Sequence, residues 1–396
     1  MRSALAALSL VAGFLPAAAA GDPAALYLGE ETNLRAALGD GPAQFPARLF
    51  PCANCHGRDG LGGGEGTLRA PRIVPLPGKA GLSAQDILRA AADGIGPDGR
   101  ILDRAMPRYS LTSDDAVALA AWLAERPARE GRGVTATEVR MILPFDPRTE
   151  GIARPFADGF ADAMAGVRPW GRTVVLVPVA WGADAPPVPA IASVGAALPG
   201  TADRAVLANL DLIDIAPLHP VDTMSADAAP LCATRPEAIR ALAGVLPRGT
   251  RVAVIAQGGT TAHAADAALT AAGLRVVPVD QNPDAALLLS DIPERRAAAA
   301  GLPHVLGFRD QIGAPAAQQL IASGTRRISL VDACGTLTGD LTGAARARRL
   351  GELAGERVGT ALQAAGRNLS RARLVEALAG TGSAAQPTIH DWKDGS

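Results

Sequence analysis

Five consecutive residues, Cys52-Ala53-Asn54-Cys55-His56, carry the clearest chemistry in this 396-residue sequence. Two cysteines separated by two residues and followed directly by histidine form the C-x-x-C-H pattern, the attachment site of a c-type haem. Each thiol can form a thioether to one edge of the haem, and His56 is placed to bind the iron from one face. Because the sequence contains this pattern once, it predicts one covalent haem c.

Two other interpretations of the pattern are a zinc site and a redox-active dithiol. A zinc site would need two further Cys or His ligands at short spacing, and the neighbouring sequence has none. A thioredoxin-like dithiol would lie where a strand leads into a helix, whereas a stretch rich in proline and glycine follows His56. The haem interpretation requires instead a second axial ligand further along the chain.

Met106 is the candidate for that second ligand. It lies 50 residues after His56, in a loop just before a helix that begins with the cap residues 112–115. An isolated methionine often fills a gap in a core, which is the alternative. A thioether is a soft, neutral ligand that raises the potential of haem iron. With six ligands the iron has no open position, so we expect it to exchange electrons and not to bind oxygen.

Residues 21–128 resemble a class I c-type cytochrome domain. The likeness rests on Cys-Ala-Asn-Cys-His-Gly, the glycine-rich loop 60–66, Ala70-Pro71, Met106-Pro107-Arg108-Tyr109 and a last helix that carries Trp122. The sequence departs from the family in the long stretch between Tyr27 and Cys52, which indicates an extended first connection.

The resemblance implies an all-α domain that holds a low-spin haem with His56 and Met106 as axial ligands. An early helix over 25–38 would cross the last helix at Trp122. The carbonyl of Pro71 would orient the His56 imidazole, since haem ligands need such support. A plain turn proline is the alternative for Pro71.

The first 20 residues have the pattern of a secretory signal peptide. Arg2 supplies a positive start, an apolar run extends from Ala4 to Leu15, and Ala18-Ala19-Ala20 is a small-residue cleavage site. An uncleaved membrane anchor would need about 20 apolar residues, and this run is shorter and ends at Pro16. We therefore expect a periplasmic protein that begins near Gly21 and has no transmembrane segment.

The other two cysteines, Cys232 and Cys334, are far from the haem motif. An oxidising compartment would permit them to form a disulfide. Two buried free thiols are the alternative, because sequence does not show whether their Cα atoms lie close enough to be bridged.

The sequence pattern changes near residue 129. Residues 129–134 are interpreted as a linker, because the stretch 126–133 is polar, contains Pro and Gly and lacks apolar periodicity. Over 135–396 short apolar strands alternate with amphipathic helices, which predicts parallel sheets with helices on both faces. This length exceeds one ordinary sheet domain and suits two lobes. The predicted strands are 139–143, 173–179, 210–215, 251–256, 274–279, 285–289, 305–307 and 327–331. The predicted helices are 156–164, 236–246, 261–272 and 314–323, and the run 341–379 is largely helical with a break near 368–370.

This order of elements resembles a type I periplasmic substrate-binding protein, a family that binds amino acids and related small molecules. Leu143-Pro144-Phe145, followed by Gly151 and a helix with Asp158-Gly159, is similar to the opening of that family. The strand 251–256 leading into 258–261 is similar to the start of its second lobe. The resemblance implies an α/β domain of two lobes with parallel sheets and a cleft for a small molecule.

A ligand in an open α/β sheet binds beyond the carboxyl ends of the strands. The candidate cleft residues are therefore Asp146 and Thr149 after the first strand, and Thr260 and Thr261 after the strand 251–256. The two latter threonines begin a helix, where free N–H groups can hold an anion. Simple N-capping of the helix by threonine is the alternative.

Three functions fit this organisation. The first is an electron carrier, whose second domain docks a redox partner such as an exported dehydrogenase or a terminal acceptor. The second is a solute-binding or sensory protein with an accessory haem. The third is an enzyme, which is disfavoured because the sequence has no G-x-S-x-G elbow, P-loop or H-E-x-x-H motif. A net charge of -1 without a basic stripe excludes nucleic acid as the expected partner.

Overall fold

The computed structural model describes residues 21–30, 33–39, 41–65, 67–76, 78–182, 188–198, 207, 212–219, 228–256, 259–289, 292–339, 341–382 and 384–393. The candidate signal peptide over 1–20 lies outside these residues. The chain divides into two compact units, Met1–Arg129 and Glu130–Ser396.

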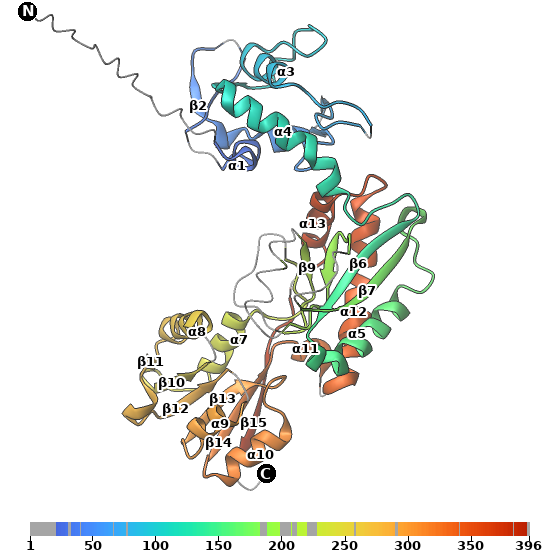
Figure 1. Ribbon diagram of the computed structural model, residues 1–396. Helices are drawn as coiled ribbons and strands as arrows, with labels where there is room; N and C mark the ends of the chain where they lie inside the picture. Colours follow the sequence, from blue (N-terminus) through green and yellow to red (C-terminus); the bar gives the residue numbers. More distant parts are fainter. Residues whose placement is uncertain are drawn as a thin grey trace, which may run out of the picture. The chain divides into compact units, whose positions relative to one another are not determined.

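The first unit is built from short helices and one long helix (Figure 1). Its helices are α1 (Pro23–Leu28), the 3₁₀ turn Ala47–Leu49, α2 (Cys52–His56), α3 (Ala84–Leu88), the π-helical turn Arg89–Asp93 and α4 (Ser113–Glu130). The described residues of this unit also form five short strands. β1 (Arg35–Ala37) pairs antiparallel with β2 (Gln44–Pro46) and β5 (Arg108–Tyr109), and β3 (Gly63–Glu65) pairs with β4 (Leu68–Ala70). These strands are too short to give an alternating pattern in the sequence.

Helix α1 is shorter than the helix expected over 25–38. Gly29 ends it in the left-handed region with a φ of 77°, and a Cβ there would lie 2.7 Å from the Cβ of Pro51. Only glycine suits both requirements, so the chain leaves the helix at this point. The predicted contact with the last helix is nevertheless confirmed, because the rings of Tyr27 and Trp122 lie 5.1 Å apart.

Helix α4 begins with mutual capping and extends further than expected. The Asp115 N–H donates to the Thr112 hydroxyl and the Thr112 N–H donates to the Asp115 carboxylate. Its buried face is formed by Ala116, Leu119 and Leu123. The helix continues through Pro127 to Glu130, so the first two residues of the expected linker 129–134 are helical.

The first sheet of the second unit is parallel, with strand order β7-β6-β8-β9. Its strands are β6 (Glu138–Phe145), β7 (Thr173–Ala180), β8 (Ala192–Val194) and β9 (Ile213–Ile215). Successive residues of β6 face opposite sides: Met141 and Leu143 pack on the cluster that includes α5 (Glu150–Ala163), whereas Ile142 joins a second cluster. The three-residue strand β8 is not predicted from the sequence, because it is too short to show a pattern.

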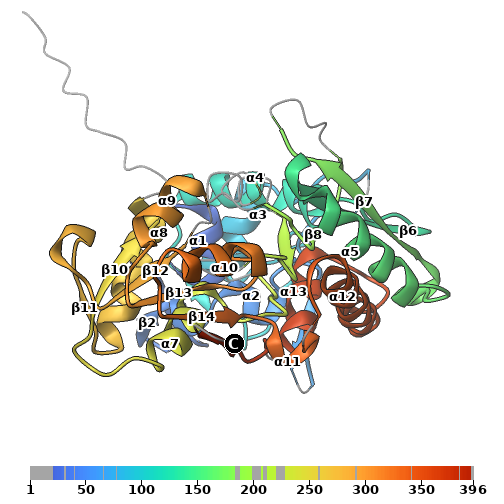
Figure 2. The same cartoon turned by 90° about the horizontal axis from the view of Figure 1, so that it is seen from below.

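The second sheet has the order β11-β10-β12-β13-β14-β15 and is parallel except for β15. Its strands are β10 (Arg251–Ile255), β11 (Arg275–Val276), β12 (Ala285–Leu288), β13 (His304–Phe308), β14 (Arg327–Asp332) and β15 (Thr388–Lys393). The helices around it are α7 (Arg235–Ala243), α8 (Gly259–Ala271), α9 (Pro293–Ala299) and α10 (Ala314–Ala322). Alternate residues of β12 pack on α7 and α8 and on α9 and α10, so helices cover both faces, as predicted (Figure 2).

Two helices near the C-terminus return to the first sheet. They are α12 (Gly343–Ala365), which follows the short α11 (Gly335–Thr338), and α13 (Arg371–Ala379). Helix α12 packs closely along α5, because glycines remove side chains from the contact. A Cβ at Gly159 would lie 2.1 Å from the carbonyl oxygen of Arg348, and one at Gly351 would lie 2.0 Å from that of Phe156.

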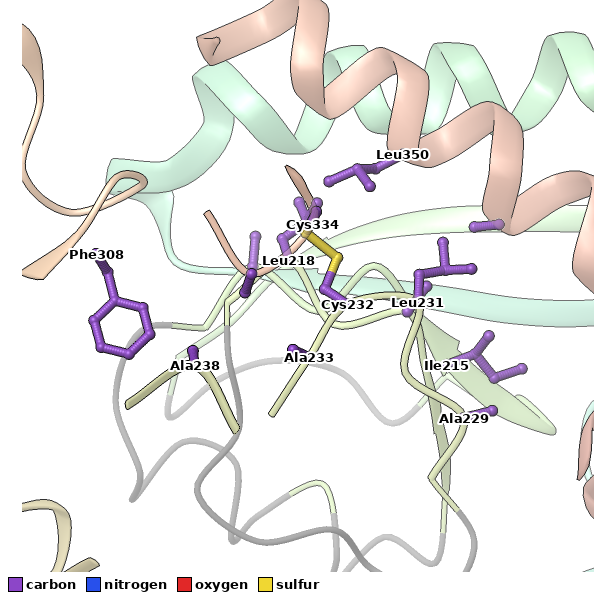
Figure 3. Close-up of a cluster of buried hydrophobic side chains, with 14 of the residues drawn as sticks. Ile215, Leu218, Ala229, Leu231, Cys232, Ala233, Ala238, Phe308, Cys334 and Leu350 are labelled. Carbon is purple, nitrogen blue, oxygen red and sulfur yellow. A yellow bond between two sulfur atoms is a disulfide. The ribbon is translucent and has the colours of Figure 1, made fainter. Parts of the chain in front are cut away.

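The second unit therefore consists of two α/β lobes, each built on one sheet. The chain passes between the lobes three times: after β9, after β14 and after α13. Cys232 lies in the first of these connections and Cys334 in the second. The two cysteines form a disulfide with their Cα atoms 4.6 Å apart, within the buried apolar cluster shown in Figure 3.

Candidate functional site

The C-x-x-C-H residues form the single helical turn α2. Residues three apart lie on one side of a helix, so Cys52 and Cys55 face the same direction. Cys55 is exposed and Cys52 is half-buried, and neither is part of a disulfide. His56 ends the turn and is only 9% exposed. One turn of helix thus presents two free thiols beside a buried imidazole.

The imidazole of His56 is held in one tautomer. Its Nδ1 lies 2.8 Å from the carbonyl oxygen of Pro71, which confirms the contact expected from the sequence. A carbonyl can only accept a hydrogen bond, so Nδ1 carries the proton and Nε2 has a free lone pair. Burial lowers the pKa of His56, so the ring is neutral at pH 7. A neutral imidazole with a lone pair on Nε2 is the form that binds a metal.

Glycines bring the Pro71 carbonyl to this position. A Cβ at Gly63 would lie 2.8 Å from the carbonyl oxygen of Cys55, so the β3–β4 hairpin could not approach α2 with any other residue there. Gly62 has a φ of 88°, and its Cβ would lie 2.8 Å from the carbonyl oxygen of Ala70. The glycine-rich loop found in the sequence therefore serves the close approach of backbone to backbone.

Two side chains hold the backbone directly after His56. The Tyr27 hydroxyl donates to the carbonyl of Gly57 at 2.6 Å, and the Arg126 guanidinium donates to the carbonyl of Arg58 at 2.6 Å. Arg126 also lies over the Trp122 ring, 4.4 Å from its centroid, and Trp122 packs on Tyr27. Sequence reasoning missed Arg126, although its position four residues after Trp122 on a helix could have indicated their contact.

Met106 lies half-buried in the loop before β5, and its N–H donates to the carbonyl of Asp103 at 3.1 Å. The end of the same segment reaches α2 through Tyr109, whose hydroxyl donates to the carbonyl of Phe50 at 2.5 Å. Burial raises the pKa of the Cys52 thiol to about 11, while its hydrogen bond with Tyr109 acts in the opposite direction. The segment that carries Met106 is thus joined to the segment that carries Cys52.

Two of the candidate cleft residues of the second unit, Asp146 and Thr149, form hydrogen bonds within the first lobe. Thr149 donates its hydroxyl to the carbonyls of Asp146 and Ala197, both at 2.8 Å. Hydrogen bonds from Arg148 lower the pKa of Asp146 to about 2. Both residues follow β6 in the first lobe.

The two other candidates belong to the second lobe. Thr260 and Thr261 lie in the first turn of α8, and Thr261 is half-buried. The side chain of Thr260 lies outside the described part of the chain. A site made of all four residues would therefore draw on both lobes.

A comparison with known protein families identifies a domain within the first unit. Residues 40–126 match the family model described as cytochrome c. These residues are a cytochrome c domain. No curated protein matches the sequence.

Several solved structures are similar to the part of the chain outside the cytochrome c domain. A fatty acid ABC transporter substrate-binding protein from Thermomonospora curvata is 17% identical, with a TM-score of 0.45, and the match covers 63% of this chain and 82% of that one. A leucine-binding protein from Thermotoga maritima is 14% identical, with a TM-score of 0.44 and coverage of 61% and 87%. A substrate-binding periplasmic protein from Ralstonia solanacearum is 17% identical, with a TM-score of 0.43 and coverage of 61% and 88%.

The residues of the cytochrome c domain fit a haem c. Two thiols face one direction from one turn, and a neutral imidazole beside them has a lone pair to give to iron. Cys52 touches two buried apolar clusters, one around Leu26 and Tyr109 and the other around Tyr27 and Leu119. An apolar surrounding is what a haem pocket requires, because it limits access of water to the iron.

A pocket and a polar residue pair lie outside the cytochrome c domain. A pocket of about 720 Å³ is lined by residues of α5, α12 and the turn after α5, and not by the strand-end candidates. His219, after β9, and Asp310, after β13, form a pair at 3.3 Å that joins the two lobes. Sequence reasoning missed this pair, because the two residues are 91 positions apart.

The described residues lack two other kinds of feature. No group of three or more His, Cys, Asp and Glu side chains there is arranged to hold a metal ion. No helix among them is long and apolar enough to cross a membrane.

Proposed function

We propose that this protein is a periplasmic monohaem c-type cytochrome that transfers single electrons, and that its second unit docks a partner protein or binds a small molecule. The observation that carries the proposal is the hydrogen bond between His56 Nδ1 and the Pro71 carbonyl. It leaves Nε2 free beside two thiols of the same helical turn. No other described part of the chain combines a metal-binding imidazole with two free thiols in this way.

Each residue of the site has a role in this proposal. Cys52 and Cys55 would hold the haem covalently, and His56 and Met106 would be the ligands of its iron. The bound haem supplies a one-electron couple. The Pro71 carbonyl fixes the tautomer and the orientation of His56. The redox partner is an exported dehydrogenase or a terminal acceptor, and the chain itself is not an enzyme.

Covalent attachment of haem tests the base of this proposal. We expect the exported wild-type protein to retain haem after denaturation and extraction with acidified solvent, because thioethers survive both. The Cys52→Ala/Cys55→Ala variant should release all of it, as measured by pyridine haemochrome absorbance. Haem that remains attached in the double variant would refute the proposed attachment site. Wild-type protein without any haem would refute the proposed function.

Solute binding is the second candidate function, and one observation favours it. The strand ends of both lobes contribute to the His219–Asp310 pair, where each side chain is 13% exposed. Burial acts to raise the pKa of Asp310, but the hydrogen bond and charge of His219 outweigh it, so the pKa lies below its usual value. A charged and largely buried group at the strand ends is suited to a polar ligand.

A thermal-shift screen separates the two candidate functions. A ligand present at 100 times its Kd stabilises the folded state by about 2.7 kcal/mol. We therefore expect a clear shift of the second unit's transition if amino acids, small carboxylates, alcohols or amines bind there. No shift with any compound, together with a reversible haem couple, would favour the electron carrier with a docking unit.

A further inference from the structure

Arg108 lies two residues after Met106, and its side chain turns back toward the backbone of Met106. One end of its guanidinium donates to the carbonyl of Met106, and the other donates to the carbonyl of Leu102 at 3.4 Å. A single side chain therefore closes the loop that carries Met106. Neither the cytochrome c match nor the C-x-x-C-H pattern assigns a role to this arginine.

The surroundings of Arg108 keep its side chain in this place. Its own backbone belongs to β5, where it pairs with Ala37 of β1. Gly94 lies beneath the guanidinium, and a Cβ there would be only 2.3 Å from two of its nitrogens. The Leu102 N–H donates to the carbonyl of Gly94 at 2.8 Å, which holds the start of the loop. The guanidinium thus packs against Gly94 on one side and bonds to the Met106 loop on the other.

We propose that Arg108 is a positioning residue that fixes the Met106 backbone and thereby holds the sulfur as an axial ligand of the haem iron. The proposal rests on the proposed ligation by His56 and Met106. Hydrogen bonds from a charged donor are stronger than neutral ones, and the guanidinium fork can engage two carbonyls at once. A lysine ammonium is a compact point charge without the planar fork that spans the two carbonyls, so lysine should replace arginine only in part.

Competition by added imidazole measures how firmly Met106 is held. Imidazole binds the oxidised haem only when the methionine leaves, so its apparent affinity rises as the hold on Met106 weakens. We expect Arg108→Ala to bind imidazole roughly tenfold more tightly than wild type, which is the effect of losing one charged hydrogen bond. Arg108→Lys should lie between the two. Arg100→Ala is the control, because it removes the same charge from an exposed side chain in the preceding turn.

The outcomes of this titration separate the proposal from its premise. Unchanged imidazole affinity in Arg108→Ala would overturn the role of Arg108. If Met106→Ala binds imidazole no more tightly than wild type, the axial assignment itself is wrong. A shift in redox potential without a change in imidazole affinity would show that Arg108 acts only through its charge. If Arg108→Ala does not fold, the imidazole affinity of Arg108→Lys is compared with that of Arg100→Ala. Equal affinities would then overturn the role of Arg108.

An independent set of contacts concerns the three connections between the lobes of the second unit. The first and second are joined by the Cys232–Cys334 disulfide and by a hydrogen bond from Ala233 N–H to the Ala333 carbonyl at 2.9 Å. The third joins the first through Ala385 N–H, which donates to the carbonyl of Leu231 at 2.7 Å. The first connection is therefore bound to both of the others, and covalently to the second.

A buried carboxylate adds a charged link between the lobes. The Asp332 side chain is fully buried and lies 2.9 Å from Arg346 of α12, which packs on the first sheet. It also lies 3.6 Å from Arg309, which follows β13 of the second sheet. Only the Arg346 contact crosses between the lobes, because Asp332 and Arg309 both belong to the second. Moving Arg346 away would leave the buried carboxylate with the more distant Arg309 alone, which is unfavourable.

We infer that the disulfide and the Asp332–Arg346 contact hold the two lobes in one relative orientation, so that the second unit acts as a rigid body. A hinge normally works because a few connecting residues can change their backbone angles. Here a covalent bond between two of the connections restricts such changes. A rigid unit suits docking of a partner better than closure around a ligand.

Spin-label distances across the lobes test this inference. Labels can replace the exposed residues Trp170 in the first lobe and Val279 in the second, through non-cysteine chemistry that leaves the native cysteines intact. We expect one narrow distance distribution in the native protein and one at least twice as wide in Cys232→Ser/Cys334→Ser. Equal widths, or two separate distances in the native protein, would overturn the inference. If the variant does not fold, reduction of the labelled native protein gives the same comparison.

Discussion

At the scale of single residues, one backbone carbonyl determines what His56 can do. Because the Pro71 carbonyl accepts a hydrogen bond from Nδ1–H, the other ring nitrogen, Nε2, keeps a free lone pair and can bind a metal. The sequence predicts His56, Cys52 and Cys55 because covalent haem attachment demands these residue types at this spacing. It does not predict Arg126, whose contact with the Arg58 carbonyl depends on folding across 68 positions.

His304 gives the second unit a stability that depends on pH. Its Nε2 lies 2.9 Å from the hydroxyl of Ser329, which donates to Asp391. Burial, with a smaller effect from the charge of Arg327, lowers the pKa of His304 to about 4. An unfolded histidine titrates near pH 6.5, so the unfolded state binds protons first as the pH falls. The folded state therefore loses stability between about pH 6.5 and about pH 4, by at most about 3 kcal/mol.

Urea unfolding at pH 7, 5.5 and 4.5 measures this effect. We expect the stability of the second unit to fall over this range in the wild type and to fall less in His304→Gln, which has no group that titrates there. The same pH dependence in both proteins would show that other groups cause it.

At the scale of elements, glycine decides where helices end and how closely they pack. The sequence predicts most strands and helices of the second unit, because each is a continuous apolar or amphipathic run. It does not predict the end of α1 at Gly29 or the antiparallel edge strand β15, which depend on contacts with Pro51 and with β14. It also places a linker where α4 continues, because Pro127 usually ends a helix.

The contact between α5 and α12 predicts opposite effects of the same substitution at two glycines. Gly351→Ala places a Cβ 2.0 Å from the carbonyl oxygen of Phe156, so the helices must move apart. We expect a loss of about 1 to 3 kcal/mol in the free energy of unfolding. Gly151→Ala on α5 meets no atom within 4 Å and should stabilise the helix by up to about 1 kcal/mol. Equal effects of the two variants in urea unfolding would contradict this packing.

At the scale of the whole molecule, each compact unit has its own buried clusters, and the disulfide belongs to the second unit alone. The bond closes a loop across a sequence separation of 102 residues. Loop-closure entropy predicts a loss of about 4 to 5 kcal/mol when such a bond is removed. We expect Cys232→Ala/Cys334→Ala to lower the calorimetric transition of the second unit while the melting of the haem absorbance stays unchanged. A parallel fall of both transitions would show that the units unfold together.

The proposed function requires one haem c per chain that exchanges one electron at a time. Spectroelectrochemical titration of the purified, exported protein tests it most directly when combined with the haem content per chain. We expect one haem per chain and a single reversible step with the slope of a one-electron couple. In Met106→Ala the step should move to a lower potential, since a thioether ligand raises the potential of haem iron. Absence of a reversible step would refute one-electron transfer, and a Met106→Ala variant with the wild-type potential and spectrum would refute Met106 as an axial ligand.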